Sequence, residues 1–161
     1  PDVLMVGEIR DRDTAEMAIQ AAETGHLVLS TLHSGSATEA LTRLRHLGLP
    51  GYLLADCLRL VVTQRLIRRL CPHCKEADAS GFVASHGCVY CQQGHHQRLG
   101  LFEHLEMSPA LAQLCIQGSD RQSLQVCAAQ AGWPTLRSSA ETLWQQGEIS
   151  RIEILRVLGN E

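Results

Sequence analysis

The chain has 161 residues, 45% of them apolar, and a formal net charge of −3. These values exclude a disordered tail, because enough apolar surface is present for a core, and they give no reason to expect a broad nucleic-acid surface. No charged leader followed by an apolar run is visible, and no apolar stretch approaches the roughly 18 residues of a membrane span. Because the first residues already have the pattern of a strand interior, we expect the chain to be part of a longer protein.

The N-terminal residues predict a strand, a helix and a second strand. Residues 3–7 form a short apolar run, typical of a buried strand in a parallel sheet. Asp13 and Glu16 have the spacing of a capping box, which predicts that a helix starts there and ends near Gly25. Residues 26–33 are a second apolar run, bracketed by histidines.

Further helices are predicted up to residue 69. Ser36 and Glu39 form another capping box, so we expect a helix from there to about Leu47. A longer helix is predicted over 52–69, with its apolar face formed by Leu54, Cys57, Leu58 and Val61. Strand, helix, strand and helix in this order are typical of an α/β layer with a parallel sheet.

The composition changes at Cys71. From there to about Gln97 the chain is rich in Cys, His and Gly, and it has too few large apolar residues for a core of its own. A strand is predicted over 99–106, and Ser108 followed by proline predicts the start of a helix. The remaining helices are expected at 109–117, 121–131, 135–146 and 151–158, the last with a capping box of Ser150 and Glu153.

Four of the seven cysteines form two Cys-x-x-Cys pairs, Cys71 with Cys74 and Cys88 with Cys91. Two such knuckles supply the four thiolates of a closed, structural Zn²⁺ site, which leaves no open position for catalysis. A redox pair or a metal-free pair is the alternative. His73 and His86 stand beside the knuckles and are expected to be exposed neighbours, although either has the chemistry to replace a ligand. The other cysteines are expected to be buried free thiols: Cys57, Cys115 and Cys127.

Several ordered motifs resemble one family. Residues 2–14 resemble the Walker B segment of the type II secretion and type IV pilus assembly ATPases, and residues 25–33 resemble the histidine box of the same family. Residues 64–74 are similar to the run that leads into that family's metal-binding subdomain, and residues 98–103 to the segment that follows it. The resemblance covers essentially the whole chain and identifies it as a C-terminal fragment.

The resemblance implies an α/β fold with three parts. Residues 1–70 would be the C-terminal half of a RecA-like P-loop ATPase domain, 71–97 a tetracysteine zinc-binding subdomain, and 98–161 a mainly helical C-terminal subdomain. The implied protein is a cytoplasmic motor ATPase, peripheral to the inner membrane, that uses ATP and Mg²⁺ as a homo-hexamer. Its implied partners are inner-membrane platform or secretion-system proteins rather than nucleic acid.

The same resemblance implies roles for individual residues. Glu8 would be the Walker B carboxylate, and His33 would lie near the γ-phosphate, with Arg10 and Thr31 in support. His26 is also a candidate, but it lies at the other end of the strand, roughly 23 Å from His33 at about 3.3 Å per residue. Both histidines therefore cannot touch one phosphate in one subunit, and we expect a structural or inter-subunit role for His26.

Some features depart from the family. After His33 the chain reads Ser-Gly-Ser where the family commonly has Thr-Asn, so a looser loop is expected. No Gly-x-x-x-x-Gly-Lys-[Ser/Thr] loop occurs, so we expect this chain alone to bind ATP poorly and to hydrolyse none. The alternative functions are a non-hydrolytic docking module on a degenerate ATPase fold and, less favoured with 4% aromatic residues, a zinc-ribbon nucleic-acid binder. The basic candidates for an arginine finger are Arg10, Arg12, Arg65, Arg68 and Arg69. Most of them are expected instead to lie on a solvated face or to pair with Asp11 and Asp13, and Arg10 is the first choice for a site-supporting role.

Overall fold

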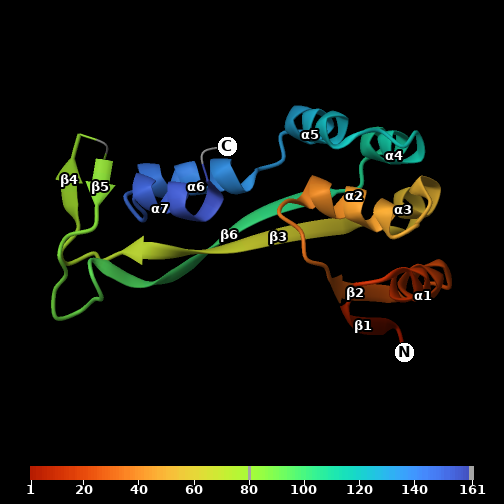
Figure 1. Ribbon diagram of the computed structural model, residues 1–161, viewed down its shortest axis with the longest axis horizontal. Coiled ribbons are helices and arrows are strands. Elements are labelled where there is room, and N and C mark those ends of the chain that lie inside the picture. Colours follow the sequence, from red (N-terminus) through yellow and green to blue (C-terminus); the bar gives the residue numbers. More distant parts are fainter. Residues whose placement is uncertain (80, 160–161) are drawn as a thin grey trace. The chain divides into compact units, whose positions relative to one another are not determined.

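The computed structural model describes residues 1–79 and 81–159, and its helices and strands are labelled in Figure 1. The chain divides into two compact units: unit 1 contains residues 1–63 and 104–133, and unit 2 contains residues 64–103 and 134–161. Among the described residues, the helices are too short and too polar for any of them to cross a membrane.

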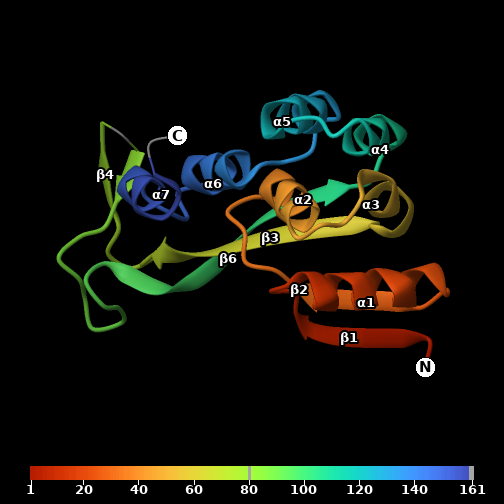
Figure 2. The same cartoon turned by 45° about the vertical axis from the view of Figure 1, so that its right-hand side comes forward.

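Unit 1 begins with two parallel strands joined by a helix. Strand β1 (Val3–Glu8) pairs with β2 (Leu27–Thr31), and helix α1 (Arg12–Glu23) connects them (Figure 2). The register places Glu8 beside Thr31, so the carboxyl ends of both strands meet at one edge. The order of strand, helix and strand is therefore confirmed, and this edge carries the polar residues singled out from the sequence. The expectation that the first strand is buried is wrong for the described chain, because Val3 and Met5 are 52% and 72% exposed.

Helix α1 starts earlier than the sequence spacing indicated. The predicted cap at Asp13 is wrong: Asp11 is the N-cap, with an extended backbone, and its Oδ1 accepts a hydrogen bond from the N–H of Thr14 at 2.9 Å. Asp13 lies in the first turn instead. Glu16 pairs with Arg12 at 2.6 Å, so its carboxylate does not reach back to a capping residue.

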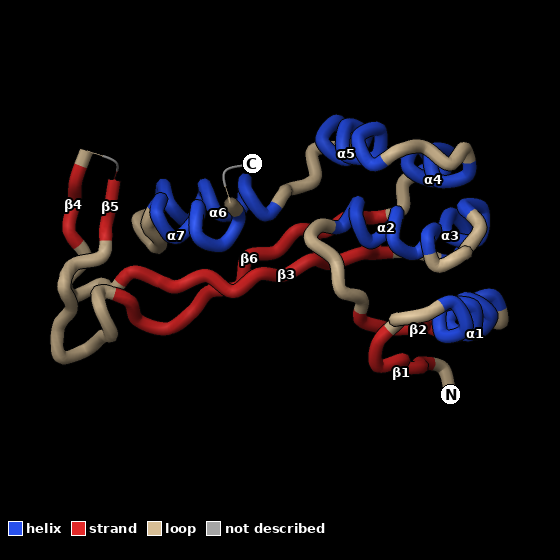
Figure 3. Tube along the Cα trace, in the orientation of Figure 1, coloured by secondary structure: helices blue, strands red, loops and turns tan. Residues whose placement is uncertain are grey.

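The predicted helix over 52–69 is wrong. Helix α2 (Ala37–His46) is followed by the short helix α3 (Gly51–Cys57), and then strand β3 (Leu60–Leu70) begins. Strand β3 pairs with β6 (His95–Glu106), and Figure 3 shows both as long strands. The prediction from sequence spacing included the residues of β3 in the helix, although they pair with β6, which lies much later in the chain.

The side chains of β3 explain why this segment is a strand. Val61, Val62 and Thr63 are consecutive β-branched residues, which lose side-chain freedom in a helix and fit a pleated sheet. Burial alternates along the strand: Thr63 and Ile67 are buried, whereas Leu60, Val62 and Leu66 are exposed. That alternation is the strand period, and it outweighed the helical spacing of the preceding leucines.

The C-terminal helices are divided between the units. Helices α4 (Pro109–Ile116) and α5 (Arg121–Gln130) share a hydrophobic core with α2 in unit 1. Helices α6 (Leu136–Gln145) and α7 (Arg151–Leu158) share a core with β3 and β6 in unit 2. The four helices predicted for this part of the chain are present.

Unit 2 also contains the cysteine segment, with the antiparallel pair β4 (Glu76–Asp78) and β5 (Gly81–Val83). An ionic cluster around one buried carboxylate connects β3 to α7. Arg68 Nη2 lies 2.7 Å from Oε2 of Glu153, whose side chain is only 1% exposed, and Arg156 pairs with the same carboxylate. The Glu153 carboxylate therefore links α7 to β3 within unit 2, instead of completing the capping box predicted with Ser150.

Candidate functional site

Glu8 lies at the end of β1 with a basic group on each side of its carboxylate. Arg10 Nε donates a hydrogen bond to Oε2 of Glu8 at 2.7 Å. His33 follows β2, and its Nε2 atom lies 3.2 Å from Oε1 of Glu8. The Glu8 side chain is 21% exposed, whereas those of Arg10 and His33 are 74% and 83% exposed. The structure thus brings three of the predicted site residues together at one edge of the sheet.

These basic groups keep Glu8 ionised. The hydrogen bond from Arg10 lowers the pKa of Glu8, and the charges of Arg10, His33 and Arg43 lower it further, while burial opposes them. An ionised carboxylate accepts hydrogen bonds and binds cations, so Glu8 is suited to either task near neutral pH. Sequence reasoning missed Arg43, because only the return of α2 brings its charge within electrostatic reach of Glu8.

Thr31 connects the carboxyl ends of β1 and β2 through hydrogen bonds. Its hydroxyl donates a hydrogen bond to the carbonyl of Gly7 at 2.6 Å, and its own carbonyl accepts one from the N–H of Ile9 at 2.9 Å. These bonds flank Glu8 on both sides and fix the point from which the chain leads to His33. Thr31 therefore supports the site through the backbone, and a direct contact with a nucleotide stays a prediction.

His26 lies away from this cluster, at the start of β2. Its Nδ1 atom is 3.1 Å from the hydroxyl of Thr24 and 3.1 Å from the carbonyl of Ala21, at the C-terminal end of α1. The structure does not join it to Glu8 and His33. Its observed contacts lie at the C-terminal end of α1, and a structural or inter-subunit role for His26 stays a prediction.

Among the five predicted arginine-finger candidates, Arg10 is the one that contacts Glu8 in the described structure. Three others pair with different carboxylates: Arg12 with Glu16, Arg68 with Glu153 and Arg69 with Glu148. Arg65 donates to the carbonyl of Gln64 at 3.1 Å.

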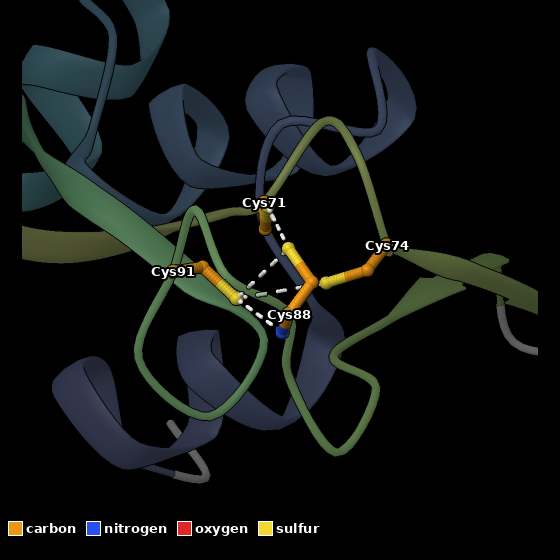
Figure 4. Close-up of side chains that lie close together, drawn as sticks. All are labelled: Cys71, Cys74, Cys88 and Cys91. Carbon is orange, nitrogen blue, oxygen red and sulfur yellow. Dashed lines mark hydrogen bonds between the residues drawn. The ribbon is translucent and has the colours of Figure 1, made fainter.

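The four predicted metal-binding cysteines form a second site, shown in Figure 4. Their sulfur atoms all lie within 4.8 Å of one another. The Cys71–Cys88, Cys74–Cys91 and Cys88–Cys91 sulfur pairs are 3.8, 3.6 and 3.7 Å apart. A tetrahedral ion with Zn–S bonds of about 2.3 Å requires sulfur separations of about 3.8 Å. The donor set and its spacing therefore fit a zinc ion.

The surroundings of the cysteines also suit thiolate ligands. The N–H of Cys88 donates to Sγ of Cys91 at 3.2 Å, which favours a thiolate there. Burial alone would raise the pKa of Cys91, but this hydrogen bond and those from neighbouring thiols lower it to about 7. The ring of His73 stacks on Tyr90 with centroids 4.7 Å apart, so the four-sulfur set is complete without it.

The fold is similar to those of a solved pilus motor and a solved ATPase. The crystal structure of the pilus retraction motor PilT with bound ADP matches with a TM-score of 0.70 and 26% identity, over 97% of this chain and 39% of that chain. The Legionella pneumophila ATPase DotB matches with a TM-score of 0.69 and 22% identity, over 95% and 37%. Together with the cysteine cluster, these matches confirm the predicted fold class.

The family described as "Type II/IV secretion system protein" matches residues 1–156, and the chain belongs to it. The Protein transport protein HofB homolog of Escherichia coli (strain K12) is 43% identical over 99% of this chain and 37% of its own length. Two Pseudomonas aeruginosa proteins are each 39% identical: the Type IV pilus assembly ATPase PilB, over 98% of this chain and 31% of its length, and the Type II secretion system protein E, over 100% and 35%. The chain thus spans about a third of these relatives, and the predicted family is confirmed.

Proposed function

We propose that the whole protein is a motor ATPase that couples ATP hydrolysis to type II secretion or type IV pilus assembly. The observation that carries the proposal is the Glu8 carboxylate, held between Arg10 and His33 where two parallel strands end. The carboxyl edge of parallel strands is where α/β proteins bind their ligands. The names of the relatives give the ligand, ATP, and the two processes.

In this proposal Glu8 accepts the hydrogen bond of a water molecule that is to attack the γ-phosphate, or of one in the Mg²⁺ shell. Its lowered pKa supports the ionised state that either role needs. His33 is mostly exposed, so its imidazole is free to face a phosphate while its Nε2 atom stays near Glu8. Arg10 would exchange its bond to Glu8 for a phosphate oxygen. Mg²⁺, when bound, neutralises charge on the phosphates.

The phosphate-binding loop is the missing part of this site. We place it in the two thirds of the relatives' length that this chain does not span. We further propose a cytoplasmic homo-hexamer at the inner membrane, attached through platform or secretion-system proteins and without nucleic acid. In such a ring an arginine of one subunit would reach the nucleotide of its neighbour.

The cysteine cluster is proposed to bind one structural Zn²⁺ through Cys71, Cys74, Cys88 and Cys91. Four thiolates leave no position for a catalytic water, so the ion would hold residues 71–97 in place. In the proposed three-part organisation of the chain, residues 1–70 belong to the ATPase core and residues 98–161 to the helical subdomain.

Phosphate release by the full-length protein tests the proposal. We expect Mg²⁺-dependent hydrolysis by the assembled, zinc-loaded oligomer and none by residues 1–161 alone. An assembled oligomer without hydrolysis would contradict it and would favour the docking module on a degenerate ATPase fold.

A further inference from the structure

The contact between His33 and Glu8 depends on the short segment that joins β2 to α2 and carries His33. Residues 32–36 join β2 to α2 without regular secondary structure, and the His33 side chain is 83% exposed. Exposure leaves little packing to hold the ring in place. The backbone on either side of His33 therefore helps to set the position of the ring: Leu32 packs against a core cluster, and Gly35 is bound by a residue of α2.

Glu39 fixes the end of this segment at α2 in two ways. Its backbone N–H donates to the hydroxyl of Ser36 at 3.2 Å, the ordinary N-cap contact. Its carboxylate Oε2 accepts a hydrogen bond from the N–H of Gly35 at 2.9 Å. In a capping box this carboxylate would bond to the N–H of the cap residue itself. Here it reaches one residue further, into the connection that carries His33.

The glycine at position 35 suits this contact. A Cβ atom there would lie 2.6 Å from Oε2 of Glu39, which is closer than the two atoms can approach. The Ser-Gly-Ser sequence, from which we expected a looser loop, therefore provides the room for Glu39 to bind the backbone. The connection is anchored by a charged acceptor, which makes a stronger bond than a neutral one.

The same carboxylate oxygen has a partner from α5. Arg121 Nη1 lies 4.0 Å from Oε2 of Glu39. Both side chains are partly exposed, at 47% and 39%, so this ion pair alone contributes at most about 1 kcal/mol. Its effect is to help hold the Glu39 carboxylate in its observed position. A second contact joins α2 to the turn that precedes α5, because Arg45 of α2 donates to the carbonyl of Gly118 at 2.8 Å.

We propose that Glu39 is a positioning residue for His33 and that Arg121 supports it from α5. Glu39 holds the backbone of Gly35, and through it the two residues that precede Gly35, so that Nε2 of His33 stays within reach of Glu8. The inference rests on the proposed function for its effect on hydrolysis, while the backbone contact itself is independent of that function.

The test compares full-length assemblies that carry Glu39→Ala, Glu39→Gln or Ser108→Ala. Misplacement by about 1 Å costs up to about a hundredfold in rate, so we expect kcat of Glu39→Ala to fall at least about tenfold with KM for ATP nearly unchanged. Glu39→Gln keeps an acceptor for Gly35 and should recover most of kcat. Ser108→Ala removes the N-cap of α4, which accepts from Leu111 at 3.2 Å, and controls for a general loss of stability. Its kcat should match that of the wild type.

Amide hydrogen exchange at Gly35 gives a readout besides activity. We expect faster exchange in Glu39→Ala, but wild-type exchange in Glu39→Gln and Ser108→Ala. If the wild type hydrolyses no ATP but this exchange pattern holds, the proposed function fails and the positioning contact stands. Unchanged exchange and kcat in Glu39→Ala would overturn the inference. So would an equal loss of kcat in Ser108→Ala, because Glu39 would then act only through helix stability.

Discussion

His33 and Arg10 hold opposite oxygens of the same carboxylate: Nε2 of His33 lies 3.2 Å from Oε1 of Glu8, and Nε of Arg10 lies 2.7 Å from Oε2. The two basic residues reach Glu8 from different directions, Arg10 from the residues just after β1 and His33 from beyond the end of β2. In the proposed function a phosphate at this edge would compete with Glu8 for Arg10, while Nε2 of His33 would stay near Glu8.

Arg10→Ala should move the pH dependence of hydrolysis. The hydrogen bond from Arg10 lowers the pKa of Glu8, so the wild-type carboxylate stays ionised to lower pH. Without Arg10 this pKa rises, and activity should be lost at a higher pH as the solution is acidified. The measurement is kcat against pH for full-length wild type and variant. Arg12→Ala removes an exposed arginine that pairs with Glu16 and serves as the control. An acidic limb that moves equally in both variants would contradict the assignment.

Zinc should bind with a stoichiometry of one ion per chain. Cys88→Ser removes a sulfur that lies 3.8 Å from Cys71 and 3.7 Å from Cys91, so metal content measured by elemental analysis should fall to a small fraction. Cys127→Ser removes a thiol outside the cluster and should keep a full complement. A purified wild-type chain without zinc, or an equal loss in both variants, would argue against the site.

Glu153→Gln should destabilise unit 2 by about 1–3 kcal/mol, because the buried carboxylate loses its charge while its two arginine partners are partly exposed. Burial would raise the pKa of Glu153, but hydrogen bonds from Arg156 and Arg68 outweigh it and hold the pKa far below its usual range. Unfolding by urea, followed through Trp144 in a Trp133→Phe background, measures the loss. Glu16→Gln breaks an exposed pair and should cost less than about 1 kcal/mol.

The stabilisation by Glu153 should also depend on pH. Because its folded pKa is depressed, the contribution is complete above the unfolded pKa of about 4.3 and is lost as pH falls below it. The difference in unfolding free energy between wild type and Glu153→Gln should therefore be constant from pH 7 to about pH 6 and shrink toward pH 3. A difference that does not change over this range would show that Glu153 acts through packing alone.

Local patterns predicted the structure well where neighbours in sequence are also neighbours in space. The parallel pair of β1 and β2 needs only α1 between its strands, and the Ser108 N-cap with the following proline lies within a single turn. Strand β3 was missed because its partner β6 lies beyond the cysteine segment. The helical spacing of Leu54 and Leu58 was a local signal, whereas the pairing that decides the structure of residues 60–70 is not local.

The candidate site also combines features that local sequence predicts with features that depend on distant contacts. Glu8, His33 and the four cysteines are carried by short motifs, and the structure brings each set together. The charge of Arg43, the contact of Arg121 with Glu39 and the burial of Glu153 depend on how helices return to the sheet or to each other. Sequence spacing predicted capping boxes at Glu39 and Glu153, but the Glu39 carboxylate accepts from the N–H of Gly35, and the Glu153 carboxylate pairs with Arg68 and Arg156.

The most direct test of the account is ATP turnover by the full-length Glu8→Gln variant, beside wild type and Glu16→Gln. Glutamine keeps the size of Glu8 but cannot act as an ionised acceptor, so turnover should fall at least about a hundredfold while nucleotide binding and assembly persist. Glu16→Gln should hydrolyse ATP at the wild-type rate, because its carboxylate pairs with Arg12 on the surface of α1. Turnover by Glu8→Gln close to that of wild type would contradict the central claim that this carboxylate acts on the γ-phosphate.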